Sequence, residues 1–474
     1  MKKTFFIIVQ LQFTVRYLLK TDIYKVLNEL GHEIVILSPN GDDKEFIKQH
    51  SLKNVHFEKL ELERYQKYYK KLLYKFFSQV RRLTLPSKNN ISTIHFKEEF
   101  LLFDLKNFKL KSRLFHLFCI AISRLTRKFR FFLLLLNFIE NLVYRKNYHK
   151  HLYQKYKPDA VILNDLGTVD ASNFIMREAR GFKVKIISLI LSWDNLTAKG
   201  VGSVKPDYAV AWNQNMADEL QNYHNIKTKN ICIGGIPHFD PYAKSFSPIE
   251  QINTDVISKN NINKFIYFGT GAPAWFTGNV KTIEIILDFI KSRNEEKIKL
   301  VVRPHPAYLG KGRFNKELQE IIRISKDNRK YIYLNLTELI ERKMGAEFSD
   351  TDQYLHEYFI RNCKILITSY STLMLEAAIF NKPIINIGFD NLRKLPTRKT
   401  SDLCSRLTHL QTILSSNFTS EAKTQDDIFL LLKTYLNDNS IKEKERKKVF
   451  NKYINYNFGN AGSAIAQQII RFIE

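Results

Sequence analysis

The chain has 474 residues, of which 44% are hydrophobic and 13% aromatic. One core rarely grows beyond roughly 250–300 residues, so two globular units are expected, and the composition excludes an intrinsically disordered chain. The formal net charge is +27, and residues 61–157 hold 22 lysine and arginine residues against 6 acidic ones. The charge excess is therefore local, and it could face nucleic acid, an anionic membrane or a polyanionic substrate.

The first elements follow the alternation of strand and helix that builds parallel sheets. Residues 4–9 and 33–37 are predicted as strands, and residues 15–30 as the helix between them. Two lysines before the first apolar run imitate a signal peptide. However, Gln10 and Gln12 interrupt that run and no small-residue cleavage site follows it. We therefore expect a buried first strand.

From about residue 60 to 157 the strand pattern gives way to helical, basic and aromatic sequence. Its most apolar run, residues 131–139, is about half of the ~20 residues that span a bilayer, so no transmembrane helix is expected. Four cations precede this run: Arg124, Arg127, Lys128 and Arg130. We expect a helical insertion that rests on an anionic membrane surface, with charges at lipid phosphates and Phe and Leu side chains in the interface. The alternative is that its apolar side packs on the first domain.

The alternation of strands and helices then resumes and continues to the end of the chain. Further strands are predicted at residues 160–163, 185–191, 208–212, 230–233, 264–268, 299–302, 331–334, 365–368 and 383–388. The stretch from about 242 to 262 lacks periodicity and indicates a domain junction. The prediction is an α/β protein of two Rossmann-like domains facing a cleft, 1–245 and 260–474, whose last helix can cross back to the first domain.

Ligands of open parallel sheets bind beyond the carboxyl ends of the strands, so polar residues at those ends are the first candidates. In the second half, Ser369, Ser371 and Thr372 follow a predicted strand and begin a helix, whose free N–H groups would hold a phosphate. Glu376 lies one turn further and can accept hydrogen bonds from a ribose or sugar diol. The alternative is a hydroxyl helix cap beside a surface glutamate.

Two other strand ends of the second half carry candidate residues. In Arg303-Pro304-His305-Pro306 the prolines fix the backbone, so Arg303 and His305 project from a rigid turn. The guanidinium of Arg303 suits a diphosphate, and the imidazole of His305 can assist a leaving group. The alternative is a turn with incidental basic residues. Gly269 and Gly271 flank a loop that could hold a phosphate.

In the first half, Asp165 and Asp194 each follow a predicted strand and could deprotonate an acceptor hydroxyl, or merely cap a helix. His238 near the junction is a third candidate. Arg16 and Asn195 are predicted to contact the acceptor.

No metal and no cofactor are expected. The sequence has no HxxxH or CxxC spacing and no GxSxG turn. The four cysteines, which lie apart in apolar runs, are predicted to be reduced core residues: Cys119, Cys232, Cys363 and Cys404.

These clusters resemble the GT-B superfamily, especially the branch of CDP-glycerol glycerophosphotransferases, capsular polysaccharide transferases and non-hydrolysing UDP-GlcNAc 2-epimerases. The likeness rests on residues 303–306 and 369–372 with Glu376, on the glycine turn and helix at 458–466, and on Gly-Gly-Ile-Pro-His-Phe-Asp at 234–240. It implies that Ser371, Thr372 and Arg303 hold donor phosphates, that Glu376 holds the ribose, and that His305 assists the leaving group. The catalytic carboxylates of the epimerases have no convincing match.

The leading hypothesis is a metal-independent glycosyltransferase that moves a sugar from a nucleotide-linked donor to an envelope glycan or lipid-linked acceptor. It is expected to be cytoplasmic and peripheral on the inner face of the cell membrane. The alternatives are transfer of a polyol phosphate from a CDP-linked donor and, less well supported, epimerisation of a UDP-sugar. A nucleic-acid-binding protein is the candidate from a different class, because tyrosines alternate with lysines in the insertion. Their helical spacing beside leucines indicates packing instead, so no nucleic acid is expected as a partner.

Overall fold

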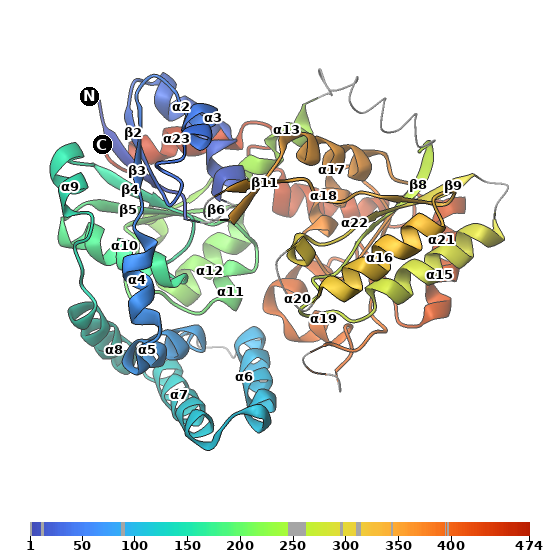
Figure 1. Cartoon of the computed structure of the whole chain (residues 1–474), viewed down its shortest axis with the longest axis horizontal. Coiled ribbons are helices and arrows are strands. Elements are labelled where there is room, and N and C mark those ends of the chain that lie inside the picture. Colours follow the sequence, from blue (N-terminus) through green and yellow to red (C-terminus); the bar gives the residue numbers. More distant parts are fainter. Residues whose placement is uncertain are drawn as a thin grey trace. The chain divides into compact units, whose positions relative to one another are not determined.

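A computed structural model describes residues 2–10, 14–86, 91–244, 262–293, 297–309, 314–342, 345–393, 395 and 398–474. The chain forms two compact units (Figure 1). The first unit comprises Met1–Ala243, Glu341–Glu347 and Asn455–Glu474, and the second comprises Lys244–Ile340 and Phe348–Ile454. Most of the predicted junction at 242–262 lies outside the described residues, as does the side chain of Cys404.

The first unit is built on a seven-stranded parallel sheet of order β3-β2-β1-β4-β5-β6-β7. Its strands are β1 (Thr4–Ile8), β2 (Glu33–Ser38), β3 (Val55–Lys59), β4 (Ala160–Leu163), β5 (Lys185–Leu189), β6 (Tyr208–Ala211) and β7 (Ile231–Ile233). The central strands β1, β4 and β5 are almost wholly buried apolar runs, as expected of a parallel sheet covered on both faces.

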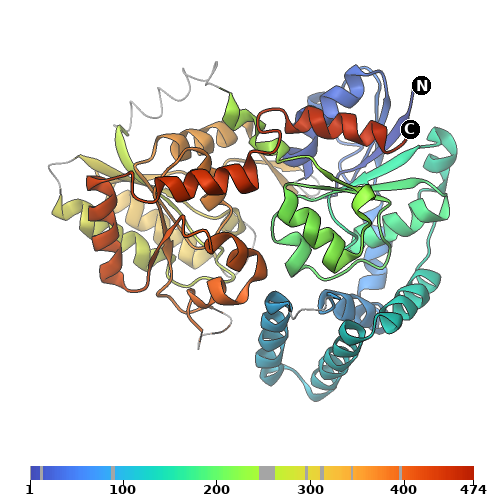
Figure 2. The same ribbon diagram turned by 180° about the vertical axis from the view of Figure 1, so that it is seen from behind.

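Helices cover this sheet on both sides (Figures 1 and 2). They are α2 (Asp22–Glu29), α3 (Lys44–His50), α10 (Asp170–Gly181), α11 (Asn195–Ala198), α12 (Gln214–His224), α13 (Asp240–Ala243) and α23 (Ala461–Arg471). The single helix predicted at 15–30 is instead a π-turn, η1 (Val15–Leu19), followed by α2. The break falls at Thr21, whose extended backbone begins α2 and whose hydroxyl donates to the Leu18 carbonyl at 2.8 Å.

The C-terminal helix α23 lies beside α2 within the first unit (Figure 2). Asp240 holds its start, because the two carboxylate oxygens accept the N–H groups of Ala461 and Gly462 at 3.0 and 2.8 Å. The two motifs at 234–240 and 458–466 are thus in direct contact.

The insertion between β3 and β4 is helical. It comprises α4 (Leu62–Tyr69), α5 (Leu72–Arg82), α6 (Ser92–Asp104), α7 (Leu110–Lys128), α8 (Arg130–Val143) and α9 (Lys150–Tyr156). Tyr65 and Tyr74 are buried and stack on Phe174 of α10, with ring centroids 4.7 and 5.5 Å apart. These two rings serve the core and are not exposed for stacking on bases. In the part of the chain that the structure describes, no helix combines the length and apolarity needed to cross a membrane.

The second unit has a six-stranded parallel sheet of order β10-β9-β8-β13-β14-β15. Its strands are β8 (Lys264–Gly269), β9 (Ile298–Arg303), β10 (Ile332–Leu334), β13 (Ile365–Thr368), β14 (Ile384–Ile387) and β15 (Ser420–Ala422). A separate pair, β11 (Leu339–Arg342) with β12 (Gly345–Phe348), includes the segment Glu341–Glu347 that belongs to the first unit. Its helices are α15 (Asn279–Ser292), α16 (Asn315–Asp327), α17 (Asp350–Asn362), α18 (Leu373–Ile379), α19 (Asp402–Arg406), α20 (Thr408–Leu414), α21 (Gln425–Asn437) and α22 (Glu443–Val449). The predicted α/β class with two Rossmann-like domains is confirmed.

Candidate active site

Four neighbouring strands of the second unit, β9, β8, β13 and β14, end on one edge of the sheet. This strand order brings the candidate donor-binding residues, which span more than a hundred positions of the sequence, to the ends of β9, β8 and β13. These residues are Gly269, Gly271, Arg303, His305, Ser369, Ser371, Thr372 and Glu376. Their side chains nevertheless have different surroundings.

Arg303 is buried and paired within the protein. Its Nη1 donates to Asn335 Oδ1 at 2.7 Å and to Asp352 Oδ1 at 3.0 Å, and its Nη2 donates to Asp352 Oδ2 at 2.6 Å. This bidentate pair joins the end of β9 to the first turn of α17. Arg303 therefore fixes the turn that carries His305, and its contact with a donor phosphate stays a prediction.

His305 is held from two sides. Its backbone N–H donates to the Thr270 hydroxyl at 2.8 Å, and its ring Nδ1 accepts the N–H of Ala307 at 3.1 Å. Burial lowers the pKa of His305 to about 4, so the ring is neutral at neutral pH. Because a backbone N–H can only donate, Nδ1 must be the acceptor and the ring proton lies on Nε2. The geometry leaves Nε2–H as a fixed hydrogen-bond donor.

The backbone N–H groups that begin the loop after β8 are hydrogen-bonded within the protein. The N–H of Thr270 donates to the Arg303 carbonyl at 3.0 Å, and the N–H of Gly271 donates to Asn279 Oδ1 at 2.8 Å. A Cβ at Gly271 would overlap the ring of Phe276, and one at Gly269 would overlap the tip of the Leu373 side chain. Both glycines thus permit close packing, and the N–H of Gly271 is already used.

The turn between β13 and α18 is sharp. Tyr370 has a left-handed backbone with a φ of 51° and donates its N–H to Asn386 Oδ1 at 3.2 Å. The Ser371 hydroxyl lies 2.8 Å from that of Thr368 and accepts the N–H of Leu373 at 3.3 Å. Ser371 and Thr372 therefore stand at the strand edge as predicted, while Ser369 is buried.

Glu376 is buried and faces a histidine that the sequence analysis missed. Its Oε2 lies 3.2 Å from His356 Nε2, and His356 Nδ1 lies 2.9 Å from the Tyr267 hydroxyl. Asp352 and His356 are four residues apart on α17 and so share one helix face. This four-residue spacing is the sequence feature that could have identified Asp352 and His356 as neighbours on one helix face.

In the first unit, Asp165 closes the turn between β4 and α10. Its Oδ1 accepts the N–H groups of Thr168 and Val169 at 2.8 and 3.3 Å, and its Oδ2 accepts the Ser172 hydroxyl. Burial raises the pKa of Asp165, opposed by these hydrogen bonds. Asp165 is thus engaged in holding this turn, and its role as a base stays a prediction.

Asp194 and Asn195 begin α11 after β5. Asp194 is half-exposed, whereas Asn195 is buried and its Oδ1 has no hydrogen-bond partner. Lys97, from helix α6 of the insertion, donates to the Ala198 carbonyl at the end of α11. Burial lowers the pKa of Lys97 to about 8 although the charge of Asp194 opposes the shift. The insertion thus reaches this strand end, which the sequence did not indicate.

His238 is surrounded by rings. Its centroid lies 4.0 Å from that of Tyr17, 4.5 Å from Phe239 and 5.6 Å from Trp212. Burial and then the charge of Arg16 lower the pKa of His238 well below its usual range, so the imidazole is neutral at neutral pH. The structure therefore brings together Arg16 and His238, which sequence analysis assigned separately.

Buried polar atoms without partners cluster at the ends of the adjacent strands β1, β4 and β5. They are Gln10 Oε1, Thr14 Oγ1, both amide atoms of Asn164, and Asn195 Oδ1. An unmet buried hydrogen-bonding group costs about 1–3 kcal/mol, so such groups are normally satisfied by water or a ligand. The unpaired donor and acceptor atoms at this edge could bind the hydroxyl groups of a ligand. Among the described residues no group of three or more potential metal ligands is present.

Residues 198–471 match the family model of CDP-Glycerol:Poly(glycerophosphate) glycerophosphotransferase. The chain belongs to this family. The match covers more than half of the sequence, including the whole candidate donor edge and His238, and it stops short of the insertion and of Asp194. The predicted resemblance is confirmed, and with it an enzyme of the GT-B transferase type.

Solved structures show the same fold at low sequence identity. The UDP complex of S. aureus MnaA is 14% identical with a TM-score of 0.55, over 99% of this chain and 97% of that one. The UDP-GlcNAc 2-epimerase of Neisseria meningitidis bound to UDP-GlcNAc is 12% identical with a TM-score of 0.53, over 99% and 100% of the two chains. The Methanocaldococcus jannaschii epimerase is 13% identical with a TM-score of 0.52, over 99% of both. No curated protein matches the sequence significantly.

Proposed function

We propose that this glycerophosphotransferase family member transfers a group from a nucleotide-linked donor, and that the group is a polyol phosphate carried by a CDP-linked donor. The observation that carries the proposal is the donor edge of the second unit. There the neutral His305, with its proton on Nε2, follows β9, and the hydroxyl turn of Ser371 and Thr372 follows β13, two strands away on the same edge of the sheet. Both lie within the span of the family match.

In this reaction an acceptor hydroxyl oxygen attacks the phosphorus of the polyol phosphate. The bond from that phosphorus to the bridging oxygen breaks, and CMP leaves. The contribution of His305 is a hydrogen bond from Nε2–H to a phosphate oxygen on which charge develops. Ser371 and Thr372 orient the phosphates, and Glu376 accepts hydrogen bonds from the ribose. Arg303 acts by positioning His305.

His238 is the acceptor-side base in this proposal. Three aromatic rings fix the orientation of its half-buried side chain. Its imidazole is unprotonated at neutral pH, as a general base must be, although burial and the charge of Arg16 lower its pKa and make it a weaker base than a free imidazole. Asp194 is the runner-up, and Asp165 is set aside because its oxygens already accept hydrogen bonds from the turn before α10 and from Ser172. Arg16, Asn164 and Asn195 would hold the acceptor hydroxyls. Replacing His238 with Gln should lower turnover by ~10²–10⁴ and spare donor binding.

Sugar transfer is the second candidate, supported by the UDP and UDP-GlcNAc ligands of the structural relatives. The departing nucleotide separates the two reactions. Incubation with CDP-glycerol should release CMP, whereas sugar transfer from a UDP-sugar would release UDP. If the protein neither binds nor cleaves any nucleotide-linked donor, the transferase proposal fails.

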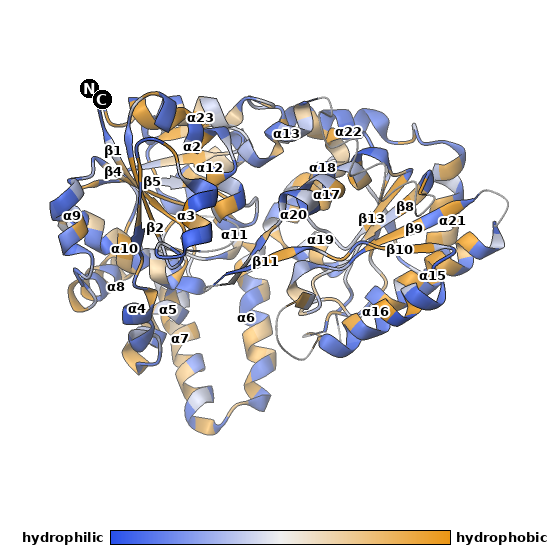
Figure 3. Cartoon of the chain, turned by 45° about the horizontal axis from the view of Figure 1, so that its top comes forward, coloured by the Kyte–Doolittle hydropathy of each residue, from blue (hydrophilic) through white to orange (hydrophobic). Residues whose placement is uncertain are grey.

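The acceptor in this proposal is a glycan or lipid-linked molecule at an anionic membrane surface, and the insertion attaches the protein there. Along α8, Phe131, Leu135, Phe138 and Leu142 recur at helical spacing and are exposed by 69, 41, 66 and 71%. Figure 3 shows hydrophobic and hydrophilic residues interleaved along the helices of the insertion. An exposed apolar face of this kind beside basic residues is typical of helices that lie in a membrane interface. Replacing Phe138 and Leu142 with serine should release the protein from vesicles without loss of stability.

A further inference from the structure

A groove of about 480 Å³ lies between α8, the C-terminal end of α10 and residues 203–205. One wall is apolar and consists of Phe138 and Leu142 of α8. The other wall carries the cations Arg145, Arg180 and Lys205. The groove therefore joins the exposed apolar face of α8 to a group of positive charges.

Two of these cations lack a counter-charge. Arg180 pairs with Asp207 at 2.9 Å and donates to the Lys205 carbonyl at 2.8 Å. Arg145 reaches only the Gly181 carbonyl, at 3.5 Å. Within the described ranges, neither Arg145 nor the Lys205 side chain has a carboxylate at ion-pair distance. An anion in the groove would meet two unneutralised charges.

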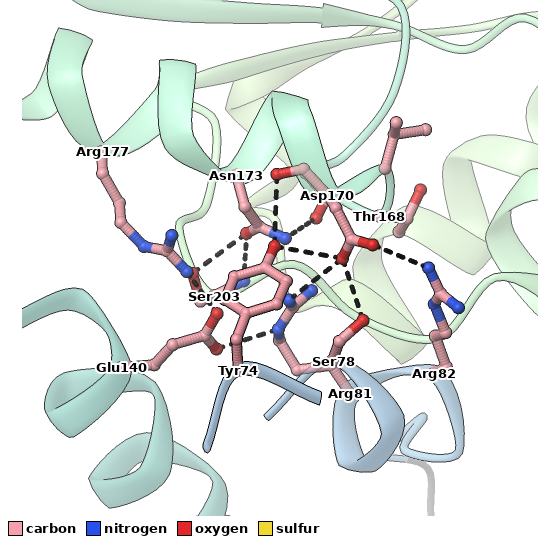
Figure 4. Close-up of polar contacts among 12 residues, drawn as sticks. Tyr74, Ser78, Arg81, Arg82, Glu140, Thr168, Asp170, Asn173, Arg177 and Ser203 are labelled. Atoms are coloured by element: carbon pink, nitrogen blue, oxygen red, sulfur yellow. Dashed lines mark hydrogen bonds and ion pairs between the residues drawn. The ribbon is translucent and has the colours of Figure 1, made fainter. Parts of the chain in front are cut away.

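The inner end of the groove is preorganised. Arg177 is buried; its Nε donates to Asn141 Oδ1 at 2.8 Å, and its Nη2 donates to Ser203 Oγ at 2.9 Å and pairs with Glu140 (Figure 4). These contacts fix the floor of the groove, where Asn141 and Ser203 add polar atoms.

The groove is remote from the strand edges that hold the candidate active site. Helix α10 starts at Asp170, near the carboxyl end of β4, and ends at Gly181, before the amino end of β5. The cationic wall lies at this second end. A ligand in the groove is therefore not a donor or acceptor in position to react.

We infer that this groove binds the phosphate headgroup of an anionic phospholipid, whose acyl chains lie along the exposed apolar face of α8. A phospholipid combines the two features that the groove presents side by side, an anionic phosphate and an apolar tail. A smaller hollow along the N-terminal half of α8 shares Lys205 and adds Arg130, so positive charge continues along the same helix. The inference rests on the membrane attachment proposed above and names the lipid class that it uses.

The test compares two variants that remove the same charge from the insertion and its surroundings. Arg145→Ala/Lys205→Ala removes the unpaired cations of the groove, and Lys111→Ala/Arg113→Ala removes two exposed cations of α7. Binding is measured to phosphatidylcholine vesicles with and without phosphatidylglycerol. We expect the groove variant to lose at least tenfold more affinity for the anionic vesicles than the α7 variant. Free glycerol 1-phosphate should compete with vesicles for the wild type and not for the groove variant.

Equal losses in the two variants would overturn the inference, because they indicate attraction by overall charge. Inorganic phosphate that binds the wild type as tightly as the vesicles do would assign the groove to a soluble anion and also overturn it. A change of oligomeric state in the groove variant, measured by sedimentation, would also overturn the inference. It would show that the groove binds a second copy of this chain. Nucleotide release with a soluble acceptor and no vesicles should be unaffected by either variant, so a failed transferase proposal would be seen separately.

Discussion

Arg303 and His305 stand two residues apart in one turn, and both are basic, yet the structure gives them different chemistry. The guanidinium is occupied by Asp352 and Asn335, whereas the imidazole accepts at Nδ1 and directs its Nε2–H to no partner among the residues that the structure describes. The sequence could predict that this turn is rigid and lies at a strand end. It could not predict the partner of Arg303, because Asp352 lies 49 residues further along and approaches only through the packing of α17.

His305 should act as a neutral donor. Replacing it with Ala is expected to lower turnover by ~10²–10³, the usual effect of removing one preorganised donor to developing charge. His305→Gln retains an N–H and should recover part of that loss. Since burial lowers the pKa of His305 to about 4, the wild-type profile of kcat/KM should show no inflection near pH 6.5 caused by this residue. An inflection there that is absent from the Gln variant would contradict the assignment.

Glu219 of α12 should cost stability at neutral pH. It is buried, one carboxylate oxygen has no partner, and burial raises its pKa to about 8. A raised carboxylate pKa means that the folded state binds more protons, so stability falls as the pH rises from the unfolded pKa through about 8. Glu219→Gln should stabilise the protein at pH 7 by up to about 3 kcal/mol and have little effect at pH 4. Urea unfolding at both pH values measures this, and an equal change at both would contradict it.

At the scale of elements, apolar runs sufficed to predict the buried central strands of both sheets, because parallel strands covered on both faces have few alternatives. The edge strands β3 and β15 were missed, because they are only partly buried and lack such a run. The helix predicted at 15–30 is divided at Thr21 because a side chain competes with the helical hydrogen bonds there. The contact of the insertion helix α6 with α11 through Lys97 was beyond prediction, because no local pattern encodes which surface an insertion covers.

The turn that carries His238 depends on a close contact with the C-terminal segment. Gly235 has a φ of 88°, and a Cβ there would overlap the Tyr456 carbonyl. Gly31 has a similar φ of 82° with no atom within 4 Å of such a Cβ, and it is therefore a matched control. Gly31→Ala should cost about 1 kcal/mol from backbone strain, and Gly235→Ala about 1–3 kcal/mol more from the overlap, with reduced turnover. Equal losses in urea unfolding would show that the contact is unimportant.

The family match covers the two units of the molecule to different extents. It covers the described second unit and, of the first unit, only residues 198–243, 341–347 and 455–471, so the motifs that carry the family resemblance lie mostly in the second unit. The insertion is nevertheless an integral part of the first unit. Glu140 of α8 is completely buried between Arg81 of α5 and Arg177 of α10, and Asp170 joins the same network (Figure 4).

Removing the carboxylate of Glu140 should unfold the first unit more easily and leave the second unaffected. Glu140→Gln takes the counter-charge from the buried Arg177 and leaves Arg81 with only the more distant Asp170, at 3.7 Å, and breaking a buried pair typically costs about 3–5 kcal/mol. Glu320→Gln breaks an exposed ion pair with Arg323 in the second unit and should cost less than about 1 kcal/mol. Calorimetry with and without the donor nucleotide assigns each unfolding transition to a unit. The nucleotide raises the unfolding temperature only of the unit that binds it. We expect Glu140→Gln to lower the nucleotide-insensitive transition, and an unchanged value would mean that the buried network does not stabilise the first unit.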